Sequence, residues 1–137
     1  ERYDDTFKTM SQLADVIKVS DEDLAGLFRS TDIELAFKTL QSWNPQASIL
    51  YTRGADGASL HTPNDVASAS AIQIKIADSV GAGDASIAGL IYSLMTWPQR
   101  SAPEHLRFAI ASGAAACMHH GATPPSLEAA IALYSQV

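Results

Sequence analysis

The sequence predicts an α/β fold with helices on both faces of a mostly parallel sheet. A helix-then-strand pattern opens the chain over residues 3–19, and a later strand pattern leads straight into a glycine-rich turn. A long apolar helix follows that turn at once. Because such sheets bind ligands at the carboxyl ends of their strands, we expect the site of this chain to lie at the turn.

The composition fits one acidic domain that occupies residues 1–137. The net charge is −6 and no run of lysine or arginine offsets it, which argues against binding to nucleic acid. Charged residues make up 18% of the chain, below the roughly 25% of ordinary soluble domains. Apolar residues make up 47%, so we expect part of the surface to be covered by something else.

Cysteine content and hydropathy predict a cytoplasmic protein. The single cysteine, Cys117, excludes an internal disulfide, and its alanine-rich surroundings favour a small buried side chain over a nucleophile. No basic and apolar leader pattern is found, and Pro98 interrupts the apolar stretch after Asp84. The sequence therefore predicts a reducing compartment and no membrane span.

The first part of the chain predicts three helices and one strand. A helix over residues 3–14 precedes a strand over residues 15–19, and Ser20 caps a short second helix. A third helix over residues 32–43 is stopped by Asn44-Pro45. The apolar residues expected on the inner faces of these helices are Phe7, Met10, Leu13, Ala14, Leu24, Leu27, Phe28, Ile33, Ala36, Phe37 and Leu40.

The middle of the chain predicts a hairpin and one further strand. A buried strand over residues 47–52, a turn over residues 53–57 and a second strand to His61 form the hairpin. Isoleucines alternate with polar residues from Ile72 to Ile76, which predicts a half-exposed strand that delivers the chain to the glycine-rich turn.

Three helices complete the chain. The first follows Asp84 and is apolar on every side, so we expect it to be buried centrally. The second runs over residues 103–119 until a glycine and two prolines end it, and Ser126 caps the last helix, which runs to Tyr134. The packed residues expected in the first two are Ile87, Leu90, Ile91, Leu94, Leu106, Ala109, Ile110, Gly113 and Cys117.

The glycine-rich turn, residues 78–84 (DSVGAGD), points most directly to chemistry. The backbone amides of Gly81, Ala82 and Gly83 can face one concavity, and the helix dipole adds positive potential, so an anion fits there. Asp84 would take a proton from an attacking hydroxyl, as a base tuned by a water-poor helix start. The alternative is structural, because Asp is a common helix N-cap and glycine patterns of this kind arise by chance.

The histidines are given structural roles. His119 and His120 are neighbours on a helix and point about 100° apart, which favours a role at the helix C-terminus over metal binding. His61 and His105 stand alone in the sequence, and we expect both at the surface.

Four other side chains carry weaker signals. Trp43 and Trp97 stand near helix ends and are expected to cover the core rather than stack on a base. Arg53 either contacts phosphate or stays solvated in its turn, and the sequence leaves both open. Ser86 has no histidine and aspartate at the spacing of a hydrolase triad.

Three segments, taken in order, resemble one family. They are residues 18–23 (KVSDED), 52–57 (TRGADG) and 78–84 (DSVGAGD). Together they resemble the ribokinase-like, or PfkB-type, carbohydrate kinases, and in detail they are most similar to bacterial fructokinases. The resemblance covers the chain from residue 3 onward and implies the C-terminal half of a three-layer α/β/α fold with a mostly parallel sheet.

This resemblance implies a role for each motif. Asp84 is implied as the catalytic base, and Gly81, Ala82 and Gly83 as the anion hole for the transferred phosphate of ATP. The residues implied to line the nucleotide are Ser20, Thr52, Gly54, Gly57 and Ile110. Ile110 stands where many relatives have Asn or His, so its contact with the base would be apolar.

Two cations are implied as well. The family's Asn-x-x-Glu motif, which helps to place hydrated Mg²⁺ and the phosphates, corresponds to Ser20 and Asp23. An aspartate is one methylene shorter than a glutamate, but it still meets Mg²⁺ through water, because this ion keeps several of its waters. A K⁺ site is implied at Asp78 and the carbonyl of Val80, beside the anion hole.

Members of the family are considerably longer, and their N-terminal half carries the sugar-binding motif and a lid. We therefore expect this chain to be a fragment, inactive alone, of an ATP-dependent sugar kinase that is a homodimer when complete. Two alternatives remain open: a non-catalytic nucleotide-binding or interaction module, and a kinase of the same fold acting on a nucleoside or a pyridoxal-type acceptor.

Overall fold

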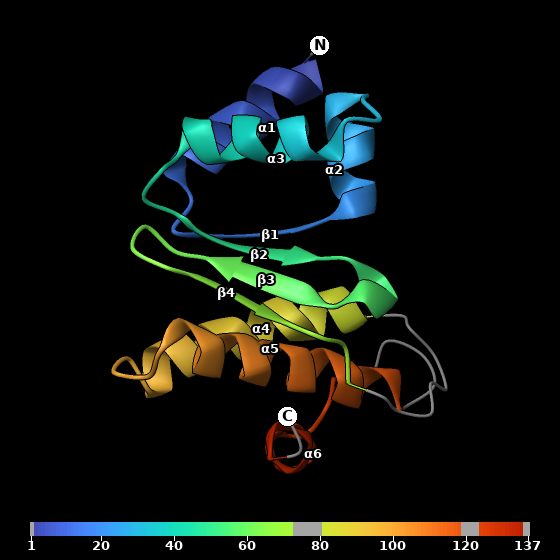
Figure 1. The fold of residues 1–137 in the computed structure, drawn as a ribbon, viewed down its shortest axis with the longest axis vertical. Coiled ribbons are helices and arrows are strands. Elements are labelled where there is room, and N and C mark those ends of the chain that lie inside the picture. The colour runs from blue at the N-terminus through green and yellow to red at the C-terminus, as the bar shows by residue number, and fades with distance from the viewer. Residues whose placement is uncertain (1, 73–80, 119–123, 136–137) are drawn as a thin grey trace.

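The computed structural model describes residues 2–72, 81–118 and 124–135, which form one sheet covered by helices on both faces (Figure 1). The strands are β1 (Val16–Ser20), β2 (Ser48–Thr52), β3 (Ala58–His61) and β4 (Val66–Ala69), in that spatial order. Helices α1 (Arg2–Leu13), α2 (Asp21–Phe28) and α3 (Ile33–Trp43) lie on one side, and α4 (Ala82–Thr96), α5 (Ala102–Cys117) and α6 (Leu127–Tyr134) on the other. None of these described helices is long and apolar enough to cross a membrane.

The described strands form a mixed sheet. β1 and β2 pair in parallel, whereas β2 with β3 and β3 with β4 are antiparallel. The predicted hairpin is confirmed. The described strands do not form a mostly parallel sheet, because a connection of only a few residues can join two neighbouring strands only in antiparallel orientation. Strand β4 escaped prediction, since Val66 is its only large apolar residue. The strand expected from Ile72 to Ile76 lies almost wholly outside the described residues.

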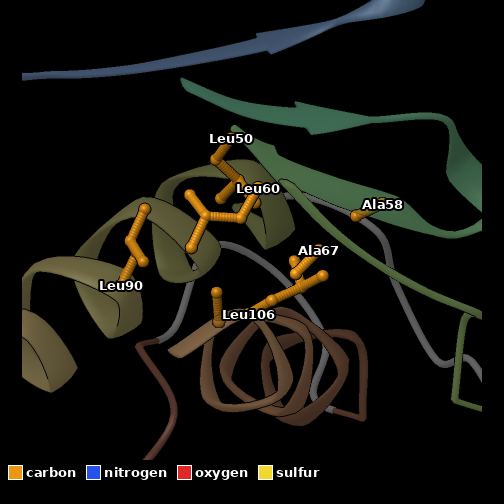
Figure 2. Packing of buried hydrophobic residues seen from close by; sticks show 7 residues of the cluster. Leu50, Ala58, Leu60, Ala67, Leu90 and Leu106 are labelled. Atoms are coloured by element: carbon orange, nitrogen blue, oxygen red, sulfur yellow. The ribbon is translucent and has the colours of Figure 1, made fainter. Parts of the chain in front are cut away.

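Side-chain alternation along β2 divides the core between the two faces of the sheet. Ile49 points to the side of α1–α3 and joins a cluster with Val19, Leu24 and Phe37. Leu50 points to the other side, where it packs with Leu60, Ala67, Leu90 and Leu106 from β3, β4, α4 and α5 (Figure 2). The sheet is therefore held between two apolar clusters.

Helix α1 contacts the core through Phe7, as predicted, but not through Met10 and Leu13. Met10 and Leu13 are 66% and 79% exposed, and Leu27 of α2 is 41% exposed. Aromatic contacts decide the orientation, because Phe7 packs edge-on against both Phe28 and Trp43, at ring-centroid distances of 5.9 and 5.6 Å, while those two rings stack on each other at 5.3 Å. Trp43 covers this side of the core as predicted.

Helix α4 is buried on one side only, which corrects the expectation of a central helix. Its buried residues are Ser86, Gly89, Leu90 and Ser93, while Ile91, Tyr92 and Met95 are exposed. The apolar count of the helix is misleading, because small residues rather than large ones make its close contact with α5. Trp97, at its end, packs edge-on against Phe108 and so covers the core as expected.

Two serines and two glycines interlock α4 with α5. A Cβ on Gly113 would overlap the hydroxyl of Ser86, and a Cβ on Gly89 would overlap that of Ser112. Each serine donates to the carbonyl four residues earlier in its own helix, Ala82 for Ser86 and Phe108 for Ser112. The two helices can approach this closely only because glycine faces serine at both crossing points.

His105 is buried, not at the surface as the sequence suggested. It is 4% exposed in α5, and its Nδ1 lies 2.7 Å from the Oγ of fully buried Ser93 in α4. Burial lowers the pKa of His105 below its usual 6.5. His61 is half-buried as well, against the ring of Phe37 at 4.6 Å, and burial followed by the charge of Arg53 lowers its pKa too.

Helix α6 begins as predicted, with the Ser126 hydroxyl accepting the N–H of Ala129. Cys117 at the end of α5 is half-buried rather than buried. His119 and His120 lie outside the described residues, as does the glycine expected to end α5.

The serine–glycine contacts predict a matched set of stability changes. Gly113→Ala should lower the free energy of unfolding by about 1–3 kcal/mol, the usual range for overpacking. Adding Ser86→Ala should restore most of it, since the Ser86 Cβ is 3.6 Å from the new methyl position. Ser112→Ala should not rescue Gly89→Ala, because there the Ser112 Cβ itself is 2.5 Å away. Denaturant unfolding of the purified variants measures this, and equal rescue at both positions would contradict the packing.

Burial of His105 predicts a loss of stability at mildly acidic pH. The unfolded chain takes up a proton at the usual pKa of 6.5, whereas the native side chain resists it, so stability is complete above that pH and falls as the pH drops below it. His105→Asn keeps a polar atom near Ser93 and does not titrate. The difference in unfolding free energy between about pH 7.5 and about pH 5 should therefore shrink in this variant. An unchanged difference would show that His105 does not carry the effect.

Candidate functional site

The carboxyl ends of two parallel strands bring the first predicted residues together. Ser20 ends β1 and Thr52 ends β2, and the two residues are register partners. The backbone beyond each strand end then turns away, into α2 after Ser20 and into the short turn 53–57 after Thr52. This places a polar edge where parallel strands commonly bind ligands.

The start of α4 leaves backbone amides without acceptors at the place where the sequence predicts an anion site. Gly81 is the residue before the helix and has a left-handed φ of 82°, which explains glycine there. The first intrahelical bond runs from the N–H of Ala85 to the carbonyl of Gly81, at 2.9 Å. The amides of Ala82, Gly83 and Asp84 therefore have no acceptor within the helix, which is one residue further along than the predicted set of Gly81, Ala82 and Gly83.

Asp84 lies in the first turn of α4 and is exposed. It is not the N-cap of the helix, since Gly81 has that place, and it is not held in the water-poor setting that the sequence suggested. Asp84 borders a cavity of about 500 Å³ between α4, α5 and the start of α6, lined mainly by apolar side chains such as Tyr92 and Phe108. A hydroxyl group arriving from solvent can reach this carboxylate.

Ser20 and Asp23 form a reciprocal cap at the start of α2. The Ser20 hydroxyl accepts the N–H of Asp23 at 3.0 Å, and Asp23 Oδ2 accepts the N–H of Ser20 at 2.9 Å. Both predicted residues therefore stabilise the N-terminus of α2. Among the described residues no three potential ligands gather around a metal position, so a metal at Asp23 would depend on water and phosphate for most of its ligands. Asp78 lies outside the described residues.

Lys18 joins the site without having been predicted as part of it. Its Nζ lies 3.9 Å from Asp23 Oδ2 and 2.8 Å from the place where a Cβ on Gly83 would be. The sequence does carry a signal, which is a lysine two residues before the end of an otherwise apolar strand.

The turn after β2 depends on its glycines. Gly54 has a φ of 55° with open space around it, whereas Gly57 has a φ of 98° and a ψ of −152° and lies against the backbone of Ala69 and Ser70. Arg53 lies over the ring of Tyr51 at 5.5 Å, and its buried Nε has no hydrogen-bond partner among the residues that the structure describes. Ile110 of α5 packs against the cluster that contains Ala58, directly after this turn.

The comparisons agree on one family. Residues 1–130 match the pfkB family carbohydrate kinases. "Probable fructokinase-7" of Arabidopsis thaliana is 32% identical over 126 residues, which are 85% of this chain but 37% of that protein. The fructokinase of Vibrio cholerae, solved with fructose, ADP and a calcium ion, has a TM-score of 0.81 and 32% identity, covering 96% of this chain and 44% of that one. The aminoimidazole riboside kinase of Salmonella enterica, solved with its riboside and an ATP analogue, has a TM-score of 0.80 and 25% identity, with coverages of 96% and 46%.

The two glycines of the turn predict unequal costs of substitution. Gly54→Ala should lower the unfolding free energy by about 1–2 kcal/mol, the cost of a left-handed residue without a clash. Gly57→Ala should cost clearly more, because its backbone conformation is nearly restricted to glycine and its Cβ would also collide with the Ala69 carbonyl. Thermal and denaturant unfolding of the two variants measure the difference, and equal costs would contradict the described turn.

Proposed function

This chain belongs to the pfkB family of carbohydrate kinases, and from that membership we propose that the protein transfers a phosphoryl group from ATP to a sugar hydroxyl, with fructose as the acceptor of first choice. The start of α4 carries the proposal. Three amides without helical acceptors and a carboxylate lie in the first turn of α4, and Lys18 of β1 reaches Gly83 in the same turn. The relatives of this chain include fructokinases.

ATP is proposed to lie across the ends of β1 and β2. Thr52, Gly54 and Gly57 would line the nucleotide, with Ser20 beside the phosphates and the apolar Ile110 beside the base. The exposure of Gly54, and the packing of Ile110 against the cluster that contains Ala58, support this placement. The likeness in overall fold to a fructokinase solved with ADP also supports it.

Phosphoryl transfer would take place at the start of α4. The acceptor hydroxyl gives its proton to the Asp84 carboxylate, its oxygen forms a bond to the terminal phosphorus, and ADP leaves with the electrons of the broken P–O bond. The amides of Ala82 and Gly83, with the positive end of the helix dipole, stabilise the negative charge on the phosphoryl oxygens. Positioning and charge account for most of the catalysis in such a reaction.

Asp23 is the described residue that would hold Mg²⁺, through water, and the ion when bound neutralises charge on the phosphates. Contact through water fits the geometry of Asp23, because its Oδ2 already accepts a hydrogen bond from the Ser20 amide. A K⁺ site at Asp78 and the Val80 carbonyl remains part of the proposal and lies outside the described residues.

The chain spans 37% of the Arabidopsis relative and 44% of the Vibrio structure. We place the sugar-binding residues in the part that this chain does not span, and we expect the 137 residues alone to be inactive. The finer fold proposal is the C-terminal half of a three-layer ribokinase-like domain. A homodimeric complete enzyme in the cytoplasm is proposed from the family resemblance.

A nucleoside acceptor is the second candidate. One specific observation favours it, which is the likeness to a riboside kinase at a TM-score of 0.80. Turnover of a panel of fructose, ribose and ribosides by the complete protein separates the two.

Asp84→Asn tests the proposed base. In the complete protein this change should lower kcat by about 10²–10⁴-fold, because the amide cannot accept the hydroxyl proton, while nucleotide binding stays largely intact. Glu34→Gln is the matched control, since Glu34 lies on α3 with its side chain 80% exposed and should leave kcat unchanged. Sugar-dependent ADP release measures turnover, and near-normal activity of Asp84→Asn would refute the assignment.

A further inference from the structure

We propose that Lys18 is a further phosphate-binding residue, whose ammonium contacts the terminal phosphates of the nucleotide at the start of α4. The inference rests on the proposed function and adds to it a positive side chain on the sheet side of the anion site.

The register of β1 directs Lys18 to that place. Val16 packs against the cluster on the α4–α5 side of the sheet, and side chains two residues apart in a strand share a face. Lys18 therefore projects to the α4 side, and its side chain is 22% exposed. Its Nζ reaches the second residue of α4, Gly83, at the N-terminal turn whose amides are free of helical acceptors.

Gly83 leaves room for this ammonium. The positive-φ glycines among the described residues are Gly54, Gly57 and Gly81, so the backbone of Gly83 does not itself demand glycine. A Cβ there would lie 2.8 Å from Lys18 Nζ and 3.4 Å from Cε. Because Gly83 has no side chain, the Lys18 ammonium can lie beside the backbone amides of the first turn of α4.

The positive charges of the Lys18 ammonium and of the α4 N-terminus favour an anion between them. A helix N-terminus carries partial positive charge, so an ammonium next to it is repelled unless negative charge lies close to both. Asp23 is the ion-pair partner that Lys18 has among the described residues, at 3.9 Å, and its Oδ2 is shared with the amide of Ser20. Phosphate oxygens in contact with Lys18 and the Gly83 amide would accept hydrogen bonds from both. These bonds are strong because the phosphate is charged, and the ammonium is as well.

The function of Lys18 would therefore concern charge alone. No atom is transferred to Lys18. Its ammonium offsets the negative charge of the ATP phosphates, including the charge that builds up on the leaving ADP during phosphoryl transfer. AMP lacks the terminal phosphates, so its binding should not depend on Lys18. This difference separates phosphate binding from a purely structural role.

Lys18→Met in the complete protein is the first test, because methionine keeps most of the volume and removes the charge. We expect kcat/KM for ATP to fall about 10²-fold, as when one donor of a charge-stabilising site is removed, with the affinity for AMP unchanged. Lys18→Arg should retain more activity than Lys18→Met. The control is Lys38→Met, since Lys38 lies on α3 and pairs with Glu34 at 3.1 Å, away from the site. Equal loss of ATP and AMP binding, or no loss of either, would overturn the proposal.

Chemical labelling of the unmodified protein gives a second test that does not depend on a variant folding. A non-hydrolysable ATP analogue with Mg²⁺ should protect Lys18 from acetylation, AMP should not, and Lys38 should react equally in all samples. Mass spectrometry of the labelled peptides measures this. Lys18 that reacts equally with and without the analogue, at concentrations that saturate binding, would overturn the proposal.

The two proposals fail in different ways. If the protein protects Lys18 with the ATP analogue but phosphorylates no sugar or nucleoside, the inference on Lys18 stands and the proposed reaction falls. If the protein phosphorylates a sugar and Lys18→Met has the same kcat/KM for ATP as the wild type, the proposed reaction stands and the inference on Lys18 is wrong. If the protein neither binds the analogue nor turns over ATP, both are wrong.

Discussion

The close approach of α4 to its neighbours is the constraint on which the site depends. On one side, glycine meets serine twice across the contact with α5, and on another, Gly83 meets Lys18 from β1. At each contact a single added carbon would push the helix away or displace a polar group. The first turn of α4 is consequently fixed relative to α5 and to Lys18 of β1. Fixed hydrogen-bond donors stabilise developing charge without having to reorganise.

Local rules recovered much of the fold. Helix caps at Ser20 and Ser126, and the hairpin between β2 and β3, follow from side-chain hydrogen bonds and turn glycines that act within a few residues. The family resemblance alone points to Thr52 as a site residue, whereas the glycine-rich turn also points to Gly81 and Asp84, and the roles of all three stay predictions. The structure shows that Thr52 is the register partner of Ser20 and that Gly81 and Asp84 lie at the start of α4.

What could not be predicted depends on contacts between distant segments. His105 looked like a surface residue because its partner, Ser93, belongs to another helix. Helix α4 looked central because its many apolar residues suggested burial, yet the residues buried against α5 include two serines and a glycine. Lys18 was overlooked because nothing near it in the sequence shows that it reaches Gly83. In each case the decisive neighbour is remote in sequence, and periodicity carries no information about it.

The exposure of Asp84 and that of the apolar face of α4 have one geometric cause. At 100° per residue, Asp84, Ala88, Ile91, Tyr92 and Met95 fall on a single stripe, opposite the buried stripe of Ser86, Gly89 and Ser93. All five residues of the first stripe are exposed. A segment packed on these apolar side chains would lie close to Asp84 and would exclude water there, where electrostatic interactions become stronger. The apolar face of α4 and the proposed base therefore share one side of the helix, so any segment that packs on this face also changes the surroundings of Asp84.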